Sequence, residues 1–531
     1  MREIIPIIDL FAGPGGLGEG FTSYRQGERK RSSFKILVSV EKDPWAHRTL
    51  ELRSFFRQFV NRPVPDDYYD YIQGQISRED LFAKWPLEAD AARKEAMHSE
   101  LGTPDDVKIY DRIQKRLERC GTKNWVLIGG PPCQAYSVIG RSRMRSANPK
   151  EFEKDRRHFL YREYLRIIAQ FQPAVFVMEN VKGLLSSRIG DDLIFKRILS
   201  DLKSPVQALE EEPDPAAKPL VYRIYSLVVQ KDDPTNLKAD DFIIEAERYG
   251  IPQTRHRVIL VGVREDIHVV PCILTRHPEQ VPVHQVLSDL PPVRSYLSKT
   301  EPPEKTWLQA IRSLRERSWF RDMYMGTEDL FGNELAEIVE NAVCSLSAEL
   351  TTGAEYMPGR ANPVYRPDWF TDPRVKGVCN HSTRAHMEAD LHRYLFASCY
   401  AKKYGVSPQL RHLPAALRPN HRNAQGDSDL ETFDDRFRVQ TTDRPATTIT
   451  AHMAKDGHYN IHYDPRQCRS LTVREAARIQ TFPDNYYFEG SRTQQYRQVG
   501  NAVPPLLAHQ VAAIINSLFE ELYANRHRQP R

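Results

Sequence analysis

The feature that most constrains this chain is an alternation of short apolar runs with segments of helical period, between residue 4 and about residue 265. Six runs have the length and composition of buried strands: residues 4–11, 34–41, 124–130, 174–180, 222–229 and 257–263. The alternation predicts an α/β fold, a Rossmann-like, doubly wound and mostly parallel sheet with helices on both faces. Because ligands bind such sheets at the carboxyl ends of the strands, we expect the functional residues there.

Composition divides the rest of the chain into further segments. Residues 78–123 are charged and helix-like, which predicts a helical insertion within a first domain of residues 1–283. Residues 284–440 mix prolines, aromatic residues and basic residues, which predicts a second, smaller domain of irregular structure. Residues 441–531 regain a helical period, and we expect this segment to return to the first domain.

Composition also excludes several classes of protein. Of the 531 residues, 40% are hydrophobic and 27% are charged, as in soluble globular proteins. No uninterrupted apolar segment approaches the ~18 residues of a membrane span, and the N-terminus has the pattern of a strand and not of a signal peptide. The 7 cysteines include no C-x-x-C pair, which favours a cytoplasmic protein without disulfides or a metal. A net charge of +5 does not by itself indicate a nucleic-acid partner.

A glycine-rich loop follows the first predicted strand. Gly13, Gly15 and Gly18 satisfy the pattern G-x-G-x-x-G, and Glu41 ends the second predicted strand. Glycines let the backbone approach a ligand, and a carboxylate at the second strand can bind ribose hydroxyl groups. By itself the loop fits a dinucleotide, another adenosyl cofactor or a tight structural turn. Phe11 within the loop suits stacking near a small nucleoside ligand.

A cysteine stands directly behind two prolines in GGPPCQAYS, residues 129–137. A free cysteine is most often a small buried hydrophobic residue. A core cysteine, however, does not require two glycines and two rigid prolines before it. The stretch therefore predicts that Cys133 is a presented nucleophile, at a strand end that also brings it near the glycine-rich loop.

Polar residues lie at two further strands. Glu179 and Asn180 follow a buried apolar strand, so we expect partial desolvation of the Glu179 carboxyl group, which suits proton donation. A helix N-cap is the alternative. Arg255 and Arg257 are two residues apart on an entering strand, so both are expected to project to one face. Opposite a thiol and a carboxylic acid, they suit an anionic substrate with a polar edge, unless they are solvated charges on an edge strand.

In order and in type, these residues resemble the motifs of the carbon-5 cytosine-specific DNA methyltransferases, a class I S-adenosylmethionine-dependent family. The resemblance covers roughly residues 4–265 and 440–520, and the variable region lies where that family has its target-recognition domain. The matching residues are Phe11–Gly16, Glu41, Pro131–Gln134, Asp155 and Arg156 with Leu160, Glu179–Val181, Gln253 with Arg255 and Arg257, Arg469–Arg478 and Gly500–Pro504.

The resemblance implies an enzyme that transfers methyl from S-adenosylmethionine to carbon 5 of a cytosine flipped out of a specific duplex DNA sequence. It implies that Cys133 attacks carbon 6, that Glu179 holds N3 and the exocyclic amine, and that Arg257 meets O2. Arg255 would orient the loop or a phosphate. The implied cofactor-binding residues are Phe11, Ala12, Gly13, Gly15, Gly16, Glu41, Gln75, Pro131, Asn501 and Val503. The implied DNA-binding residues are Gln134, Ser137, Gln253, Arg255 and Arg384, with Arg360, Tyr365 and Arg366 as further candidates.

One departure and two alternatives accompany the resemblance. Gln75 stands where the family often has an aspartate that contacts adenine. A tRNA cytosine-5 methyltransferase would carry a Cys-Phe-Thr signature, which does not occur here. A catalytically silent S-adenosylmethionine-binding regulator would be expected to lack Cys133 or Glu179. We expect a cytoplasmic monomer that acts on double-stranded DNA, with a cognate restriction endonuclease or phage-defence proteins as possible partners.

Overall fold

The computed structural model describes residues 4–27, 32–59, 62–132, 160–189, 192–209, 220–298, 306–325, 332–419 and 434–528. Five residues of the sequence prediction lie outside these ranges: Cys133, Gln134, Ser137, Asp155 and Arg156.

The central sheet confirms the predicted α/β fold. Its strand order is β3-β2-β1-β4-β5-β11-β8, and β9 pairs with β11 beside this path. The pairs from β3 to β5 are parallel, whereas β11 is antiparallel to β5, β8 and β9. The strands are β1 (Ile5–Leu10), β2 (Phe34–Glu41), β3 (Ala96–His98), β4 (Val126–Gly129), β5 (Val175–Val181), β8 (Tyr222–Tyr225), β9 (Ile243–Glu245) and β11 (His256–Arg264). The six predicted apolar runs coincide with six of these strands.

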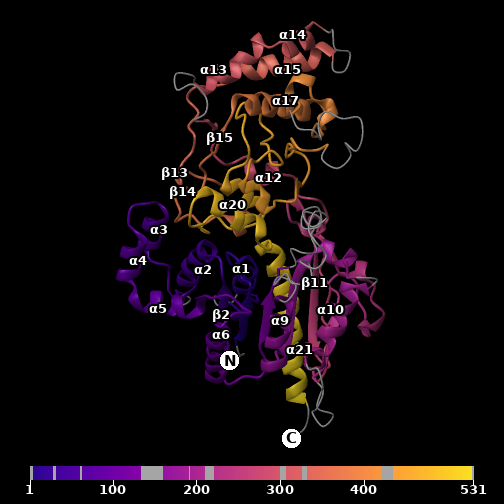
Figure 1. Ribbon diagram of the computed structural model, residues 1–531. Helices are drawn as coiled ribbons and strands as arrows, with labels where there is room; N and C mark the ends of the chain where they lie inside the picture. The colour runs from indigo at the N-terminus through magenta and orange to yellow at the C-terminus, as the bar shows by residue number, and fades with distance from the viewer. Residues whose placement is uncertain are drawn as a thin grey trace.

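Helices cover both faces of the sheet (Figure 1). On β1, Ile5 and Ile7 belong to the hydrophobic core that includes α1 and α21, whereas Ile8 and Leu10 belong to the core that includes α6, α9 and α10. This division follows from the strand geometry, since successive side chains point to opposite faces. The helices are α1 (Gly16–Ser23), α2 (Pro44–Arg57), α3 (Asp66–Ile72), α6 (Asp106–Cys120), α9 (Leu160–Phe171), α10 (Ile194–Lys203), α11 (Pro205–Leu209) and α21 (Pro505–Arg528).

The prediction that residues 78–123 form an insertion is wrong. The segment contains α4 (Arg78–Lys84), α5 (Pro86–Glu95), the edge strand β3 and the crossover helix α6. β3 pairs in parallel with β2, and α6 contributes Ile109 and Ile113 to the core. The sequence concealed this arrangement because β3 has only 3 residues, too few to form an apolar run within a charged stretch.

The C-terminal helices complete the first domain. α20 (Arg492–Asn501) leads into α21, which packs against α1 and shares the core of β1 and β4. By length and composition, the stretch Arg492–Asn525 could cross a membrane, but 72% of its most apolar window is buried inside the protein. This burial is that of a core helix.

The second domain has a helical core where the sequence predicted irregular structure. Figure 1 shows α13, α14, α15 and α17 gathered at the end of the molecule away from the sheet. Their apolar residues, such as Trp307, Phe320 and Leu391, pack into one core. Prolines and charged residues between short helical periods had concealed it. The elements are α12 (His284–Leu287), α13 (Trp307–Arg312), α14 (Ser318–Tyr324), α15 (Gly332–Cys344), α16 (Pro367–Phe370), α17 (Glu388–Tyr404), β12 (Tyr296–Leu297), β13 (Tyr356–Pro358), β14 (Gly377–Cys379) and β15 (Ala385–His386).

The predicted boundary between residues 440 and 441 does not separate two cores. Ile461 and Cys468 lie in the same core as α17. The helix α19 (Val473–Ile479) lies in a core that also contains residues of α12 and α20. The segment after residue 441 therefore builds part of the second domain before it returns to the sheet, because a helical period marks a helix but not the core to which it belongs.

Candidate active site

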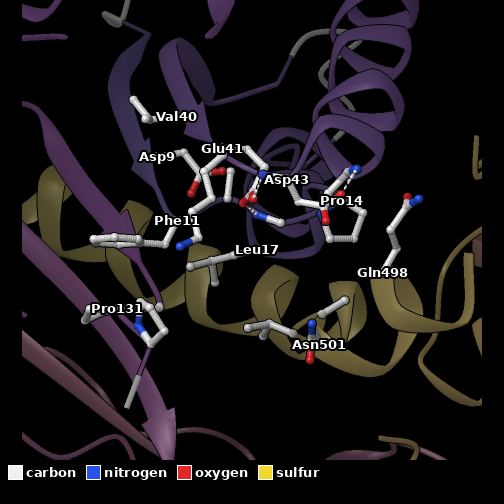
Figure 2. A pocket seen from close by; sticks show the side chains of 18 of the residues that line it. Asp9, Phe11, Pro14, Leu17, Val40, Glu41, Asp43, Pro131, Gln498 and Asn501 are labelled. Carbon is white, nitrogen blue, oxygen red and sulfur yellow. Dashed lines mark hydrogen bonds between the residues drawn. The ribbon is translucent and has the colours of Figure 1, made fainter. Parts of the chain in front are cut away.

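A cavity of about 450 Å³ lies at the carboxyl ends of β1, β2, β3, β4 and β5. Among the described residues its walls come from the glycine-rich loop, the residues after β2 and β3, Gly130–Pro132 and α20 (Figure 2). The crevice forms here because the strand order reverses at β1: β2 and β3 lie on one side of β1, and β4 and β5 lie on the other. Its volume is that of a small-molecule site.

The glycine-rich loop is held by Glu41. Gly13 N donates to Glu41 Oε2 at 2.7 Å, and Asp43 N donates to Oε1 at 2.7 Å. Phe11 and Gly13 have positive φ angles of 56° and 58°, so the turn depends on this support. Burial raises the pKa of the Glu41 carboxyl group. Each carboxylate oxygen has a further lone pair, so Glu41 can hold the loop and also accept hydrogen bonds from ligand hydroxyl groups.

Two of the predicted cofactor-binding glycines pack against the protein instead of lining the cavity. A Cβ on Gly15 would lie 2.9 Å from side-chain atoms of Leu50 and Tyr486, and a Cβ on Gly16 would lie 2.3 Å from the Val503 carbonyl oxygen. These glycines therefore allow the loop to approach α2 and the C-terminal segment. The predicted residues Phe11, Ala12 and Gly13 do line the cavity.

The residues that follow β3 form another wall of the cavity, which the sequence does not predict. Ser99, Glu100 and Leu101 line the cavity, whereas Gln75 does not. Gln75 lies in the turn between α3 and α4, where its amide donates to Gln73 Oε1 at 2.8 Å. The sequence assigns the adenine contact to Gln75 because it does not identify β3 as a strand, whereas the residues that line the cavity follow β3. An acidic residue directly after a strand is the signal that could have found Glu100.

Helix α20 and the residues after it form the fourth wall. Asn501 and Val503 line the cavity as expected, together with Gln494, Arg497 and Gln498. Figure 2 shows Gln498 and Asn501 on this helix, across the cavity from Glu41. Arg497 is exposed and has no ion pair with any described residue. The other cation of the lining, Lys42, is paired with Glu100 at 3.0 Å.

A buried carboxyl group, Asp9, also lines the cavity. The Asp9 side chain is 1% exposed, and neither of its oxygens has a hydrogen-bond partner in the described structure. Burial, and to a smaller extent the negative charges of Glu41 and Glu95, raise the pKa of Asp9 to about 8, although Arg57 opposes the shift. Asp9 was missed because an aspartate near the end of an apolar strand has no local signature.

Glu179 is paired with Arg257 beside the cavity. Arg257 Nε lies 3.0 Å from Glu179 Oε1, and both side chains are largely buried. The antiparallel register of β5 and β11 creates the pair, since Arg257 stands opposite Val181, two residues from Glu179. Burial lowers the pKa of the Arg257 guanidinium group, against the opposing effect of Glu179. A carboxylate and a guanidinium are thus fixed side by side, and together they offer acceptors and donors to one polar ligand edge.

The same corner explains the two glycines before the prolines. A Cβ on Gly129 would lie 2.6 Å from the Leu10 carbonyl oxygen, and one on Gly130 would lie 3.1 Å from Glu179 Oε2. Asn180 Nδ2 donates to the Pro131 carbonyl oxygen at 3.2 Å. The loop that leads to Cys133 is therefore seated against the end of β5, next to the Glu179 carboxyl group.

Comparison with known proteins identifies the family. A family model described as C-5 cytosine-specific DNA methylase matches residues 105–205 and 239–517, which is most of the chain. The chain belongs to the C-5 cytosine-specific DNA methylase family.

Curated members of the family are similar along most of their length. The type II methyltransferase M.Bpa9945I of Bacillus paralicheniformis is 32% identical, over 96% of this chain and 98% of that protein. The type II methyltransferase M.AgeI of Thalassovita gelatinovora is 26% identical, over 96% and 98%. The DNA (cytosine-5-)-methyltransferase M.ApeKI of Aeropyrum pernix is 26% identical, over 74% and 81%.

Two residues expected at the DNA are enclosed in this family member. Gln253 is fully buried, and its amide donates to the Ile479 carbonyl oxygen and to Gln480. Arg255 is 2% exposed and donates to the carbonyl oxygens of Ile449 and Ala502 at 2.8 and 2.9 Å. Both side chains fasten the entry to β11 to the C-terminal segment. DNA contact by Gln253 and Arg255, and catalysis by Arg255, stay predictions: in this structure both side chains bind within the chain, and it is Arg257 that meets Glu179.

The second-domain candidates also divide by environment. Tyr365 donates to the Gly250 carbonyl oxygen at 2.8 Å, and Arg366 pairs with Asp368 at 2.9 Å, so both have partners within the chain. Arg360 is exposed. Arg384 reaches toward α20 and lies 4.8 Å from the centroid of the Tyr496 ring.

Six of the seven cysteines lie within the described residues. Cys379, Cys399 and Cys468 are buried, and burial raises the pKa of each thiol. Cys120, Cys272 and Cys344 are exposed. Within the described ranges, no cluster of three or more His, Cys, Asp or Glu residues could hold a metal ion.

Proposed function

We propose that this chain methylates carbon 5 of cytosine in a specific sequence of double-stranded DNA, with S-adenosylmethionine as methyl donor. The observation that carries the proposal is the pairing of Glu179 with Arg257 beside a nucleoside-sized cavity, in a chain of the C-5 cytosine-specific DNA methylase family. The names of the relatives, type II methyltransferases, support a role beside a restriction endonuclease in a bacterial cytoplasm. We further propose that the chain acts as a monomer.

The cavity fits S-adenosylmethionine by charge and by shape. Its lining includes the carboxyl groups of Asp9, Glu41, Asp43, Glu100 and Glu179 against few cations, which suits a ligand that carries a sulfonium and an ammonium group. When bound, the cofactor supplies the activated methyl group. We assign the ribose hydroxyl groups to Glu41, which already presents an anchored carboxylate.

Other wall residues would fix the remaining parts of the cofactor. Phe11 would pack against the adenosyl group, and Ser99 and Glu100 would take the polar edge assigned from sequence to Gln75. Asn501 and Val503 would close the cavity from the C-terminal side. Arg497, the exposed and unpaired cation of the lining, would meet the cofactor carboxylate.

The cytosine would enter between the Glu179–Arg257 pair and the loop that carries Cys133. Glu179 would hold N3 and the exocyclic amine, and Arg257 would hold O2. The Cys133 thiolate would bond to carbon 6, which makes carbon 5 nucleophilic. After methyl transfer, loss of the carbon-5 proton to a base and cleavage of the sulfur–carbon bond restore the ring. Flipping the base from the duplex costs a few kcal/mol, which contacts to the DNA backbone would offset.

Bisulfite sequencing of DNA from cells that express the chain tests activity and target sequence together. We expect one recurrent motif to be protected from conversion. The Cys133→Ser variant should lose methylation entirely, because an alcohol is far less nucleophilic than a thiolate, while its affinity for DNA and S-adenosylhomocysteine stays within about threefold of wild type. A duplex with 5-fluorocytosine in the motif should also form a covalent adduct with the wild type alone. Retained methylation in the serine variant would contradict the assigned role of the sulfur.

A further inference from the structure

We propose that Arg384 and Arg492 form a binding site for one backbone phosphate of DNA, at the junction between the second domain and α20. This inference rests on the proposed function, since it concerns the same DNA substrate. Arg384 directly precedes β15 and lies against Tyr496 of α20, the helix whose first residue is Arg492.

The two guanidinium groups converge on one aromatic ring. The guanidinium carbon of Arg384 lies 4.8 Å from the centroid of the Tyr496 ring, and Arg384 Nη2 donates to the Ala454 carbonyl oxygen at 3.3 Å. Arg384 and Arg492 both exert electrostatic effects on Tyr496 and on the buried His386. Burial first, and then the positive groups around it, of which Arg384 has the largest effect and Arg492 a smaller one, hold the pKa of His386 well below its ordinary value, so the histidine adds no positive charge of its own. The site is a local concentration of guanidinium charge.

Neither cation is neutralised within the described structure. Arg384 Nε and Nη1 and Arg492 Nε are enclosed without a hydrogen-bond partner, and no described carboxylate lies within ion-pair distance of either side chain. Enclosing a guanidinium N–H group without an acceptor destabilises the protein, because the group loses its hydrogen bonds to water and gains none in exchange. An anion that arrives from outside would supply the missing charge.

The geometry suits a phosphodiester. Arg384 Nε and Nη1 are enclosed and its Nη2 donates to the Ala454 carbonyl oxygen, so Arg384 contributes mainly its charge, whereas of the Arg492 nitrogens only Nε is enclosed and the terminal donors remain at the surface. Gly457, with φ of 81°, lets its loop lie against Ser470, because a Cβ there would be 2.7 Å from the Ser470 side chain, and the same loop lies beside Arg384. Guanidinium groups bind phosphate oxygens through paired N–H donors. The position between the second domain and the helix that lines the cofactor cavity is where a duplex would be held for base flipping.

The test measures DNA binding by the Arg384→Met and Arg492→Met variants of the full chain, on the duplex identified by bisulfite sequencing. Methionine keeps the packing of the stem against Tyr496 but removes the charge. Arg119→Met, at an exposed residue of α6, is the matched control for loss of one positive charge. We expect each site variant to bind DNA about tenfold more weakly at 0.1 M salt, with a salt-dependence slope lower by about one unit. Affinity for S-adenosylhomocysteine and the melting temperature should match the control.

A chemical cycle makes the test independent of folding. Duplexes with a neutral methylphosphonate at successive positions are bound by the wild type and by Arg384→Met. One position should weaken the wild type about tenfold and leave the variant unchanged, which identifies the contacted phosphate. DNA affinity and slope equal to those of Arg119→Met, or a loss confined to cofactor affinity, would overturn the phosphate site while leaving wild-type methylation intact. Absence of methylation by the wild type would instead overturn the proposed function.

Discussion

Two sets of arginines in this protein differ in what surrounds them: three buried ones around α19, and two partly exposed ones at the junction with α20. Around α19, Arg469, Arg474 and Arg478 are 0–1% exposed and have acceptors for their donors. Arg469 forms two 2.7 Å hydrogen bonds to Glu475, and Arg478 forms two of the same length to Asp484. At the junction with α20, Arg384 and Arg492 have enclosed N–H donors that have no acceptor in the described structure.

The difference separates structure from function more reliably than residue type does. A buried charge with a complete set of partners fastens segments together, as Arg474 does through the carbonyl oxygens of Cys379 and Tyr486. An enclosed donor without a partner is retained at a cost, and at Arg384 and Arg492, whose side chains are partly exposed, a ligand of opposite sign would offset that cost. Asp9, in the cofactor cavity, is also without partners, but burial keeps its carboxyl group mostly neutral below about pH 8.

The largest effect is expected for Arg478→Met compared with Arg384→Met. Removing Arg478 leaves the buried Asp484 with only the more distant Arg474 and the half-buried Asp289 without its cation, so the free energy of unfolding should fall by about 3 kcal/mol. The same change at Arg384 leaves no carboxylate without its cation and should cost about 1 kcal/mol or less. Chemical denaturation of both variants measures the difference. Equal losses would show that an unpaired guanidinium group stabilises the fold as much as a paired one, and the comparison would fail.

A smaller effect is expected at the rim of the cofactor cavity. Arg497→Gln should weaken S-adenosylhomocysteine about tenfold, because the variant loses the cation assigned to the ligand carboxylate. Affinity for 5′-methylthioadenosine, which has no carboxylate, should not change. Isothermal titration calorimetry on the two ligands, with Arg119→Gln as control, separates this contact from general damage to the cavity. Equal weakening of both ligands would contradict the assignment.

The smallest effect concerns Asp9 and pH. Because the pKa of Asp9 is about 8, its carboxyl group is mostly neutral at pH 6.5 and ionised at pH 9. Ionisation favours the sulfonium of S-adenosylmethionine over the neutral sulfur of S-adenosylhomocysteine. The ratio of their affinities should therefore rise a few-fold between these pH values in wild type and stay flat in Asp9→Asn. Calorimetric titrations across the range measure it, and a parallel rise in the variant would assign the effect to another group.

The same proton affects folding. The folded chain keeps the Asp9 proton up to about pH 8, whereas the ordinary value for an aspartate is 3.8. The folded state therefore binds more protons between these values, and stability falls as the pH rises through this window. Asp9→Asn should remove that fall.

Most strands and half of the cavity could be predicted from the sequence. Buried parallel strands are continuous apolar runs, and the glycine-rich loop, Glu41 and Glu179 stand at their ends, so local pattern and topology suffice to bring them together. β3 was not predicted because a strand of three residues is too short to show a periodic pattern. Ser99 and Glu100, which follow β3 and line the cavity, were therefore not predicted either. The helical core of the second domain escaped because short helices between prolines do not dominate the composition.

The division of labour between Arg255 and Arg257 shows where local pattern ends. Two arginines in one motif were expected to act together, but Arg257 meets Glu179, whereas Arg255 joins the carbonyl oxygens of Ile449 and Ala502. The partners of Arg255 lie about 200 to 250 residues away along the chain. Nothing within the motif specifies which acceptor reaches which guanidinium group.

The sequence alone determined the α/β fold, the order of its main strands and the chemical groups at their carboxyl ends. Those properties follow from periodicity and residue type, which are local along the chain. Only the tertiary structure decided which of these groups are neutralised, as at Arg478 with Asp289, and which remain uncompensated, as at Asp9 and Arg384. Charge compensation depends on distances between atoms of remote segments, and these distances exist only once the chain has folded.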